Sequence, residues 1–579
     1  MFIENFRDGF YAKILHQRLL ILVALDADAL CACKILQALL HADNVPYTLV
    51  PVDGVASLQR AFQEHGEQVN YVVMINCGGN IDILDVLQPE ENVIFYVIDS
   101  HRPLFLDNIF NDGQVKLIVN SQTETFQLPE FDDIYGSEVE SDEEDDEADD
   151  DDDDDEGVGE ENKLDDGSDG EGTEPARKQP KKESRYRKRR RKRIWKQKRE
   201  EIKHKYYYYA YKGTSSAMLV FDLAWKMSKD NSDLLWYAIV GLADQKVHGC
   251  IDGEKYVTDT ASMQDHVLRF AKSETASGAL TSRKITFEND LRLTLYRHWS
   301  LYESLYNSEY TACRFRVWTV KGQKKLQEFL ADIGISLSQC KQRFNCMDME
   351  TKANVLEWIE TLSSKYGLDD ISRSSFCTQF GFCNKTCAED MALCLTSLLH
   401  SKEDGHSPTD DFHTALDALS RTNASLMNDG LLLAQKHQEA IMLQVKSFID
   451  MRQPMNAGQF IYAHVDVSMP HAKYFSQSSR LTSLARFLMN AWNLTTKRAR
   501  DLPFVVSAPY NAEEGTCLIV GIPSIIEEQH KSFLGRAFEH AVARSRVRAN
   551  RDSFDASVIE LKMDDRMEFC DALSHILSA

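Results

Sequence analysis

The sequence has no long apolar run and no other mark of a membrane or secreted protein. None of its stretches reaches the roughly eighteen apolar residues that a membrane-spanning helix needs. The start, MFIENFRDGF, lacks both the basic segment and the apolar segment of a secretory signal. These absences predict an intracellular protein that contacts no membrane.

The two close pairs of cysteines that zinc sites favour are also missing. The 13 cysteines are an odd number, and most lie scattered within apolar runs, which is typical of buried thiols in a reducing compartment. The densest group does not form two close pairs, so we expect core thiols rather than metal ligands at Cys377, Cys383, Cys387 and Cys394.

No Gly-x4-Gly-Lys-Ser/Thr motif occurs, so the chain has no ATP-binding loop of its own. No internal repeat is present either. We therefore expect neither a motor activity nor a bound cofactor.

The charged residues, in contrast, are abundant and unevenly placed. Glu138–Glu174 holds 23 acidic residues and one lysine, and Arg177–Lys205 holds 17 basic residues and three acidic ones. Because such tracts repel themselves and bury almost nothing, residues 136–205 are predicted to be a disordered linker, acidic and then basic, with some helix towards Lys205. The rest of the chain is still acidic, which argues against binding duplex DNA by charge alone.

A dense basic cluster lies within this linker. In a disordered segment it is accessible to an import receptor, which favours a nuclear localisation signal and a nuclear protein. A nucleic-acid arm and a charge run that pairs loosely with the acidic tract are the alternatives, and the acidic tract alone is also compatible with a histone chaperone. The cluster consists of Arg187, Lys188, Arg189, Arg190, Arg191, Lys192 and Arg193.

Short apolar runs alternate with helix-length segments over residues 1–135. Each run is rich in Val, Ile, Leu and aromatic residues, which is typical of strands buried on both faces. The alternation predicts an α/β fold with a doubly wound parallel sheet. The runs are Leu19–Leu25, Tyr47–Val52, Tyr71–Asn76, Val93–Asp99 and Val115–Asn120.

The remainder of the chain is predicted to complete this domain with helices over 206–285, to insert a long helical region over 286–450, and to end in a smaller α/β domain over 451–579. The segment Asp290–Tyr306 is predicted to be one helix, with an aromatic stripe formed by Trp299, Tyr302 and Tyr306. Such a stripe anchors a partner interface, stacks on single-stranded bases or is simply buried.

Polar residues follow the predicted strands at the points where they end. Asp26 and Asp28 follow the first strand, Asn76 follows the third, and Asp99 and His101 follow the fourth. Because parallel strands share one carboxyl edge, these side chains are expected to converge, together with Asp244 from a later apolar run. Carboxylates, an amide and an imidazole are ligands for a hard metal ion, although Asp and Asn at such positions also cap helices.

These motifs resemble those of the RecJ/DHH phosphoesterase superfamily, whose aspartates and histidines hold two divalent cations for phosphodiester hydrolysis. Asp26, Asp28, Asp99, His101 and Asp244 match that pattern. This sequence departs from the pattern at three positions where metal ligands are replaced. The resemblance therefore implies that the site is vestigial and non-catalytic. The replacements are Ala24, Asn76 and Ser100.

These departures, together with Asp99-Ser-His-Arg-Pro103 and His298-Trp-Ser-Leu-Tyr-Glu-Ser304, resemble the cell division control protein 45 family of that superfamily. The resemblance implies a DHH-like domain, a DHHA1-like domain over Phe460–Ala579, and a replication factor without catalysis. It also implies the partners: the MCM helicase ring and the GINS complex, forming the CMG helicase, and single-stranded DNA and chromatin at origins and forks.

The alternative function is a metal-dependent single-strand phosphodiesterase or exonuclease. In a vestigial cluster without metal, removal of Asp26 or Asp99 is expected to relieve like-charge repulsion and to stabilise the fold slightly.

Overall fold

The computed structural model describes residues 2–67, 69–120, 127–136, 179–277, 283–379, 385–401, 407–496, 502–511, 513–524 and 531–578. The chain divides into two compact units, one of Met1–Thr125 with Tyr209–Ala579 and the other of Phe126–Tyr208. The acidic tract Glu138–Glu174 lies outside the described residues. Among the described helices, none combines the length and the apolar character that crossing a membrane requires.

The first sheet of the larger unit is parallel throughout, in the order β1–β7–β5–β4–β2–β3. The last five strands in chain order coincide closely with the five apolar runs of the sequence, and β2 is buried at every position. The predicted doubly wound parallel sheet is therefore confirmed. The strands are β1 Phe2–Ile3, β2 Leu19–Ala24, β3 Tyr47–Val52, β4 Tyr71–Ile75, β5 Ile94–Ile98 and β7 Val115–Ile118.

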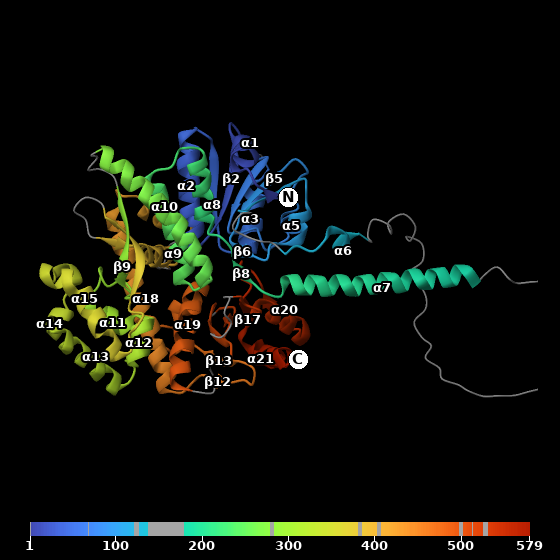
Figure 1. Ribbon diagram of the computed structural model, residues 1–579. Coiled ribbons are helices and arrows are strands. Elements are labelled where there is room, and N and C mark those ends of the chain that lie inside the picture. The colour runs from blue at the N-terminus through green and yellow to red at the C-terminus, as the bar shows by residue number, and fades with distance from the viewer. Residues whose placement is uncertain are drawn as a thin grey trace, which may run out of the picture. The chain divides into compact units, whose positions relative to one another are not determined.

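Helices cover both faces of this sheet (Figure 1). On one face α2 (Ala27–Ala42) packs against α8 (Ser216–Lys226) and α9 (Ser232–Val247). On the other face lies α3 (Val55–His65), with the short helices α4 (Ile83–Leu87) and α5 (Leu106–Phe110). Since α8 and α9 follow the charged segment in sequence, the domain is completed by residues far along the chain.

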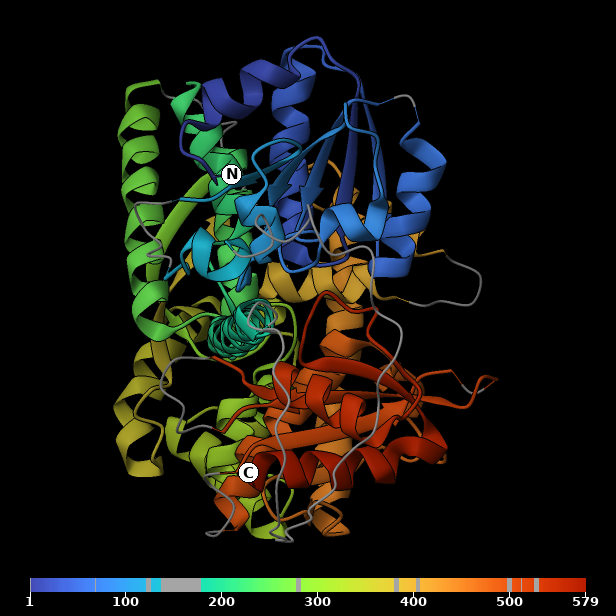
Figure 2. The same ribbon diagram turned by 90° about the vertical axis from the view of Figure 1, so that its right-hand side faces the viewer.

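The C-terminal sheet is mixed, in the order β12–β13–β14–β15–β17–β16. Alternate residues of its strands face opposite layers: Phe504 and Val506 pack with α19 (Ser478–Thr495), whereas Val505 packs with α20 (Leu534–Ser545) and α21 (Arg566–Ser578). A smaller C-terminal α/β domain is thereby confirmed. Its strands are β12 Met455–Asn456, β13 Ile461–His464, β14 Phe504–Pro509, β15 Thr516–Ile522, β16 Ala549–Asn550 and β17 Val558–Lys562. Figure 2 shows the two sheets one above the other, the parallel sheet in blue and the C-terminal sheet in orange and red.

The region between the two sheets is mostly helical, as predicted, but it also contains a three-stranded sheet in the order β11–β10–β9. The strands are β9 Lys284–Leu291, β10 Ser372–Gln379 and β11 Thr386–Cys387, and the helices are α10 Gly253–Ser277, α11 Leu301–Asn307, α12 Glu309–Phe315, α13 Val320–Ile333, α14 Leu337–Cys340, α15 Met349–Tyr366, α16 Ala388–Leu399, α17 Pro408–Ala418 and α18 Ala424–Asp450.

The predicted helix over Asp290–Tyr306 is wrong. The strand β9 runs to Leu291, and a helix begins only at Leu301. Between them the chain turns back at Leu295, which has a φ of 59° and donates its backbone amide to Asp390 at 3.0 Å. Asp290 fixes this turn because it accepts hydrogen bonds from Tyr296 at 2.5 Å and from Arg297 at 2.5 and 2.8 Å.

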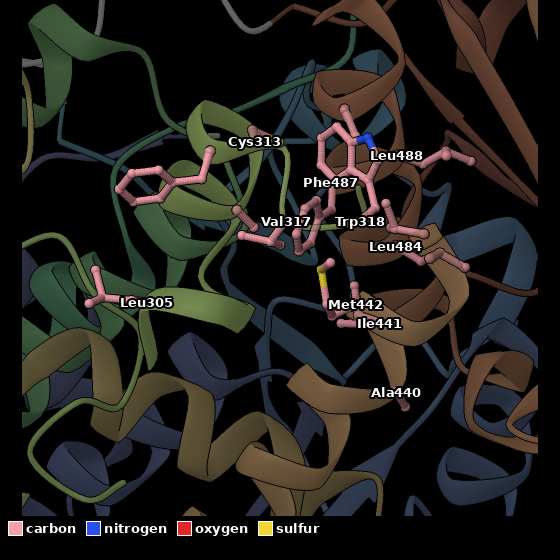
Figure 3. Packing of buried hydrophobic residues seen from close by; sticks show 14 of the residues in the cluster. Leu305, Cys313, Val317, Trp318, Ala440, Ile441, Met442, Leu484, Phe487 and Leu488 are labelled. Carbon is pink, nitrogen blue, oxygen red and sulfur yellow. The ribbon is translucent and has the colours of Figure 1, made fainter. Parts of the chain in front are cut away.

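One buried apolar cluster joins this helical region to the C-terminal sheet. Val317 and Trp318, after α12, point toward Met442 of α18 and Phe487 of α19 (Figure 3). The boundary predicted at residue 450 therefore does not separate two hydrophobic cores, although the domain limits themselves stay a prediction.

In the smaller unit, α7 (Gln179–Tyr207) covers most of the basic tract, and Lys198 forms an ion pair of 2.6 Å with Asp133 of α6 (Phe131–Tyr135). The predicted disorder is thus not found over 179–205, where helix was expected only towards Lys205. Lys, Arg and Glu are good helix formers, and Pro180 lies in the first turn, where proline is tolerated.

Candidate functional site at the end of the parallel sheet

Asp26 begins the helix that follows the first long strand. Its side chain accepts a hydrogen bond of 2.6 Å from the Ala29 amide, so it is the N-cap of α2. Aspartates at strand ends were expected to cap helices as an alternative to binding a metal ion, and Asp26 does so. It directly precedes α2, which begins at Ala27.

Asp28 is instead held by the start of another helix. Its carboxylate accepts hydrogen bonds from the hydroxyl of Ser215 at 2.6 Å and from the amides of Ser216 and Ala217, both at 2.9 Å. These donors belong to the N-terminus of α8, where free amides and the helix dipole favour an anion. Burial, followed by the charge of Asp26, nevertheless raises the pKa of Asp28 to about 6.

Asn76 connects the first carboxylates to the rest of the site. It has a φ of 55°, a left-handed conformation that asparagine tolerates better than most residues. Its side-chain amide donates to Asp26 at 3.1 and 3.2 Å and to Asp28 at 3.3 Å. Its side-chain oxygen accepts from the Ser100 amide at 3.0 Å and from the Ser216 hydroxyl at 2.6 Å.

Asp99 lies beneath this network, with its side chain fully buried. It accepts hydrogen bonds from the amides of Gly78 at 3.1 Å and Gly79 at 2.7 Å, and contacts the amide and ring of His101 at 2.8 and 2.7 Å. A Cβ on Gly79 would lie 2.9 Å from the Cβ of Asp99, so this approach requires glycine. Burial alone would raise the pKa of Asp99, but the charge and hydrogen bonds of His101 hold it below its ordinary value.

A cavity of about 400 Å³ opens between these strand ends and the C-terminal sheet. Asp244 reaches it from the last turns of α9, where it lies 3.1 Å from the ring of His248. Asp99 and Ser100 are buried below the lining. The predicted positions that line the cavity are Ala24, Asp26, Asp28, Asn76, His101 and Asp244.

The comparisons with known proteins agree with one another. A family model described as CDC45 matches residues 19–576, and the mouse Cell division control protein 45 homolog is 45% identical over 100% of both chains. The chain belongs to the CDC45 family. The crystal structure of CDC45 from Entamoeba histolytica aligns with a TM-score of 0.70 at 22% identity and covers 100% of both chains. A structure of the exonuclease RecJ bound to manganese aligns at a TM-score of 0.41 and 11% identity, over 98% of this chain and 93% of its own.

The resemblance found in the sequence is thus confirmed, and with it the role of a DNA replication factor. A nuclear location fits the CDC45 family.

In this CDC45-family chain the cleft residues do not fit a pair of divalent cations. Ala24 offers no ligand atom, and Asn76 turns its amide hydrogens, not its oxygen, toward Asp26 and Asp28. The carboxylate oxygens of Asp28 and Asp99 are already engaged by amides and a hydroxyl. A two-metal centre needs such oxygens as free anionic ligands.

Several residues of the site were missed from the sequence. Ser216, Gly78 and Gly79 donate to the buried aspartates, and Lys212 lines the cavity. Ser215 caps α8, because its hydroxyl oxygen accepts a hydrogen bond of 3.4 Å from the Met218 amide, and a serine before an apolar helix was the available signal. Nothing local showed that this helix begins beside Asp28.

The aromatic residues predicted as interface anchors do not form one helical stripe, because only two of them lie on α11. Tyr302 and Tyr306 stack with ring centroids 6.2 Å apart and pack partly buried against the core. Trp299 precedes the helix and is half-buried. Their role as interface anchors stays a prediction.

A second group of potential metal ligands lies in the three-stranded sheet. Asp290, Cys377 and Cys387 are buried, with ligand atoms within 4.8 Å of one another. The Arg297 guanidinium on Asp290 opposes a cation there, which agrees with the expectation of core thiols. Cys394 is also buried, and Cys383 lies outside the described residues.

Proposed function

We propose that this chain is a non-catalytic subunit of the eukaryotic replicative helicase, together with the MCM ring and the GINS complex. In this role it is required for initiation and elongation of DNA replication and acts in the nucleus, at origins and forks. The observation that carries the proposal is the engagement of Asp28 and Asp99 by internal donors in a member of the CDC45 family.

Contact with single-stranded DNA is part of this proposal. Among the charged side chains of the described residues that line the cavity at the strand ends, carboxylates outnumber the single lysine, and they repel a phosphate backbone. We therefore expect the strand to bind elsewhere on the helicase subunit.

Purified chain is expected to leave single-stranded DNA intact in the presence of Mn²⁺, and tagged chain is expected to co-purify from cells with MCM and GINS subunits. The measurements are a nuclease assay and mass spectrometry of the native complex. Cleavage that is lost in Asp99→Asn would instead support the alternative, a metal-dependent single-strand phosphodiesterase.

The same co-purification tests the helical region as an interface. Exposed apolar residues mark its surface, with Met349 75% and Leu337 41% exposed, so aspartate there should disturb a partner contact rather than the core. Met349→Asp and Leu337→Asp are expected to reduce recovery of the ring at unchanged melting temperature. Val467→Asp is the matched control, because Val467 is 62% exposed but lies outside this region. Equal recovery of the MCM ring with all three variants would show that these positions of the helical region do not contact it.

We also propose that the basic cluster is the import signal. Within it, Arg190, Arg191, Lys192 and Arg193 are exposed on α7, where a receptor can reach them. Replacing these four by alanine is expected to shift a fluorescent fusion from the nucleus to the cytoplasm. Replacing Lys196, Lys198, Lys203 and Lys205 removes the same charge and should leave the fusion nuclear. If both variants stay nuclear, another segment carries the signal.

A further inference from the structure

The cavity at the strand ends is strongly acidic and has one strong base. Among the described residues that line it, Lys212 is the single lysine or arginine. The carboxylates that line it number eight: Asp26, Asp28, Asp53, Asp244, Asp411, Asp552, Asp555 and Glu560. An acidic cavity of this kind attracts cations. The place of Lys212, the single lysine among the described lining residues, therefore decides which carboxylates a bound cation would still meet.

Lys212 is placed by backbone contacts to the motif of the fourth long strand. It lies on β8 (Tyr211–Lys212), which pairs antiparallel with β6 (His101–Arg102), so that Lys212 is the direct partner of His101. The next residue, Gly213, donates its amide to the Ser100 carbonyl at 2.6 Å. Ser215 and α8 then follow at once and bind Asp28. The backbone at Lys212 is therefore held beside His101 and three residues before the serine that binds Asp28, and its side chain lines the cavity.

The surroundings of Lys212 favour its charged form. Burial opposes the ammonium, but the charge of Asp26, with smaller contributions that include Asp555 and Asp99, raises the pKa of Lys212 above its ordinary value. In return, Lys212 lowers the pKa of Asp26, which burial raises. Lys212 thus offsets part of the cost of burying the Asp26 carboxylate.

We propose that the Lys212 ammonium takes over the charge of a metal ion in this cleft and excludes hard divalent cations from it. Removing a unit positive charge from a partly enclosed site favours the entry of another cation. Asp26, Asp244 and the nearby Asp555 supply the kind of oxygen ligands that Mn²⁺ and Mg²⁺ accept. The fixed lysine thereby keeps the cleft free of metal, a role that deepens the proposed non-catalytic function and rests on it.

The test is a Mn²⁺ titration of the full chain by calorimetry, with Mn²⁺ electron paramagnetic resonance as the second readout. Lys212→Met is expected to bind one Mn²⁺ about tenfold or more tightly than the wild type, and to gain melting temperature when Mn²⁺ is added. Lys212→Arg should exclude the ion as the wild type does. Lys229→Met is the matched control, because Lys229 binds Asp43 outside the cavity.

The outcomes separate this inference from the proposed function. Equal Mn²⁺ affinity in wild type and Lys212→Met, whether weak or strong, would overturn the role of Lys212. The proposed function as a helicase subunit would not be affected. Two Mn²⁺ bound by the wild type, with cleavage of single-stranded DNA, would overturn both. If Lys212→Met does not fold, Lys212→Gln keeps most of the length and polarity of the side chain and carries the same expectation.

Discussion

Asp99→Ala is expected to lower the free energy of unfolding by about 3–5 kcal/mol, as for other broken networks around a buried charge. The substitution leaves the amides of Gly78 and Gly79 and the ring of His101 without the carboxylate that accepts from them. The two glycine amides are buried, so water does not replace their lost bonds. Urea denaturation followed by circular dichroism measures the difference.

Asp53→Ala is the matched control for this substitution. Asp53 also follows a strand of the parallel sheet and lines the same cavity, but it is exposed. We expect its removal to change the free energy of unfolding by less than about 0.5 kcal/mol. A similar loss in both variants would show that the hydrogen bonds of Asp99 contribute little.

The effect of Asp99 should depend on pH in a defined direction. Because the folded pKa of Asp99 lies below its ordinary value, the carboxylate adds stability that is complete above about pH 4 and is lost as the pH falls further. The difference in free energy of unfolding between wild type and Asp99→Ala should therefore be largest near neutral pH and should become smaller below about pH 4.

This expectation replaces the one drawn from the sequence, in which loss of a strand-end aspartate relieved repulsion. The clustering of the aspartates was correctly anticipated, since parallel strands bring their carboxyl ends to one edge. Their stabilising partners were not, because Ser215 and Ser216 lie almost two hundred residues from Asp28 and donate through a helix start. Hydrogen bonds between such distant segments leave no local pattern.

The helical region shows a second limit of the sequence. The strand β9 carries Phe287 opposite Phe376 of β10, with ring centroids 4.7 Å apart, so an alternating pattern was present. The apolar residues over Asp290–Tyr306 also fit the spacing of a helix, so the sequence supported two different predictions where the segments overlap. Tertiary contacts of Asp290 decided between the two, since this buried carboxylate is satisfied only when Tyr296 and Arg297 fold back onto it.

The largest pH effect is expected from two histidines with lowered pKa values, His437, which is buried, and His298, which is half-buried. Burial, followed by the nearby Arg297, lowers the pKa of His298 to about 4. Burial, followed by Arg480, His400 and Lys436, lowers the pKa of His437 to about 2. His437 lies on α18, with its ring nitrogen 3.1 Å from the Ser397 hydroxyl.

A lowered histidine pKa adds stability that is present above about pH 6.5 and is lost as the pH falls, because unfolding then takes up a proton. At pH 5 each of the two histidines is expected to lower the free energy of unfolding by about 2 kcal/mol relative to neutral pH, or by about 4 kcal/mol together. His437→Gln removes one titrating group, so the variant should lose about 2 kcal/mol less than the wild type between pH 7 and pH 5. His575→Gln, at an exposed position on α21, should follow the wild type. Urea denaturation at pH 5, 6 and 7 measures all three proteins. Parallel pH profiles for wild type and His437→Gln would show that folding does not lower the pKa of His437.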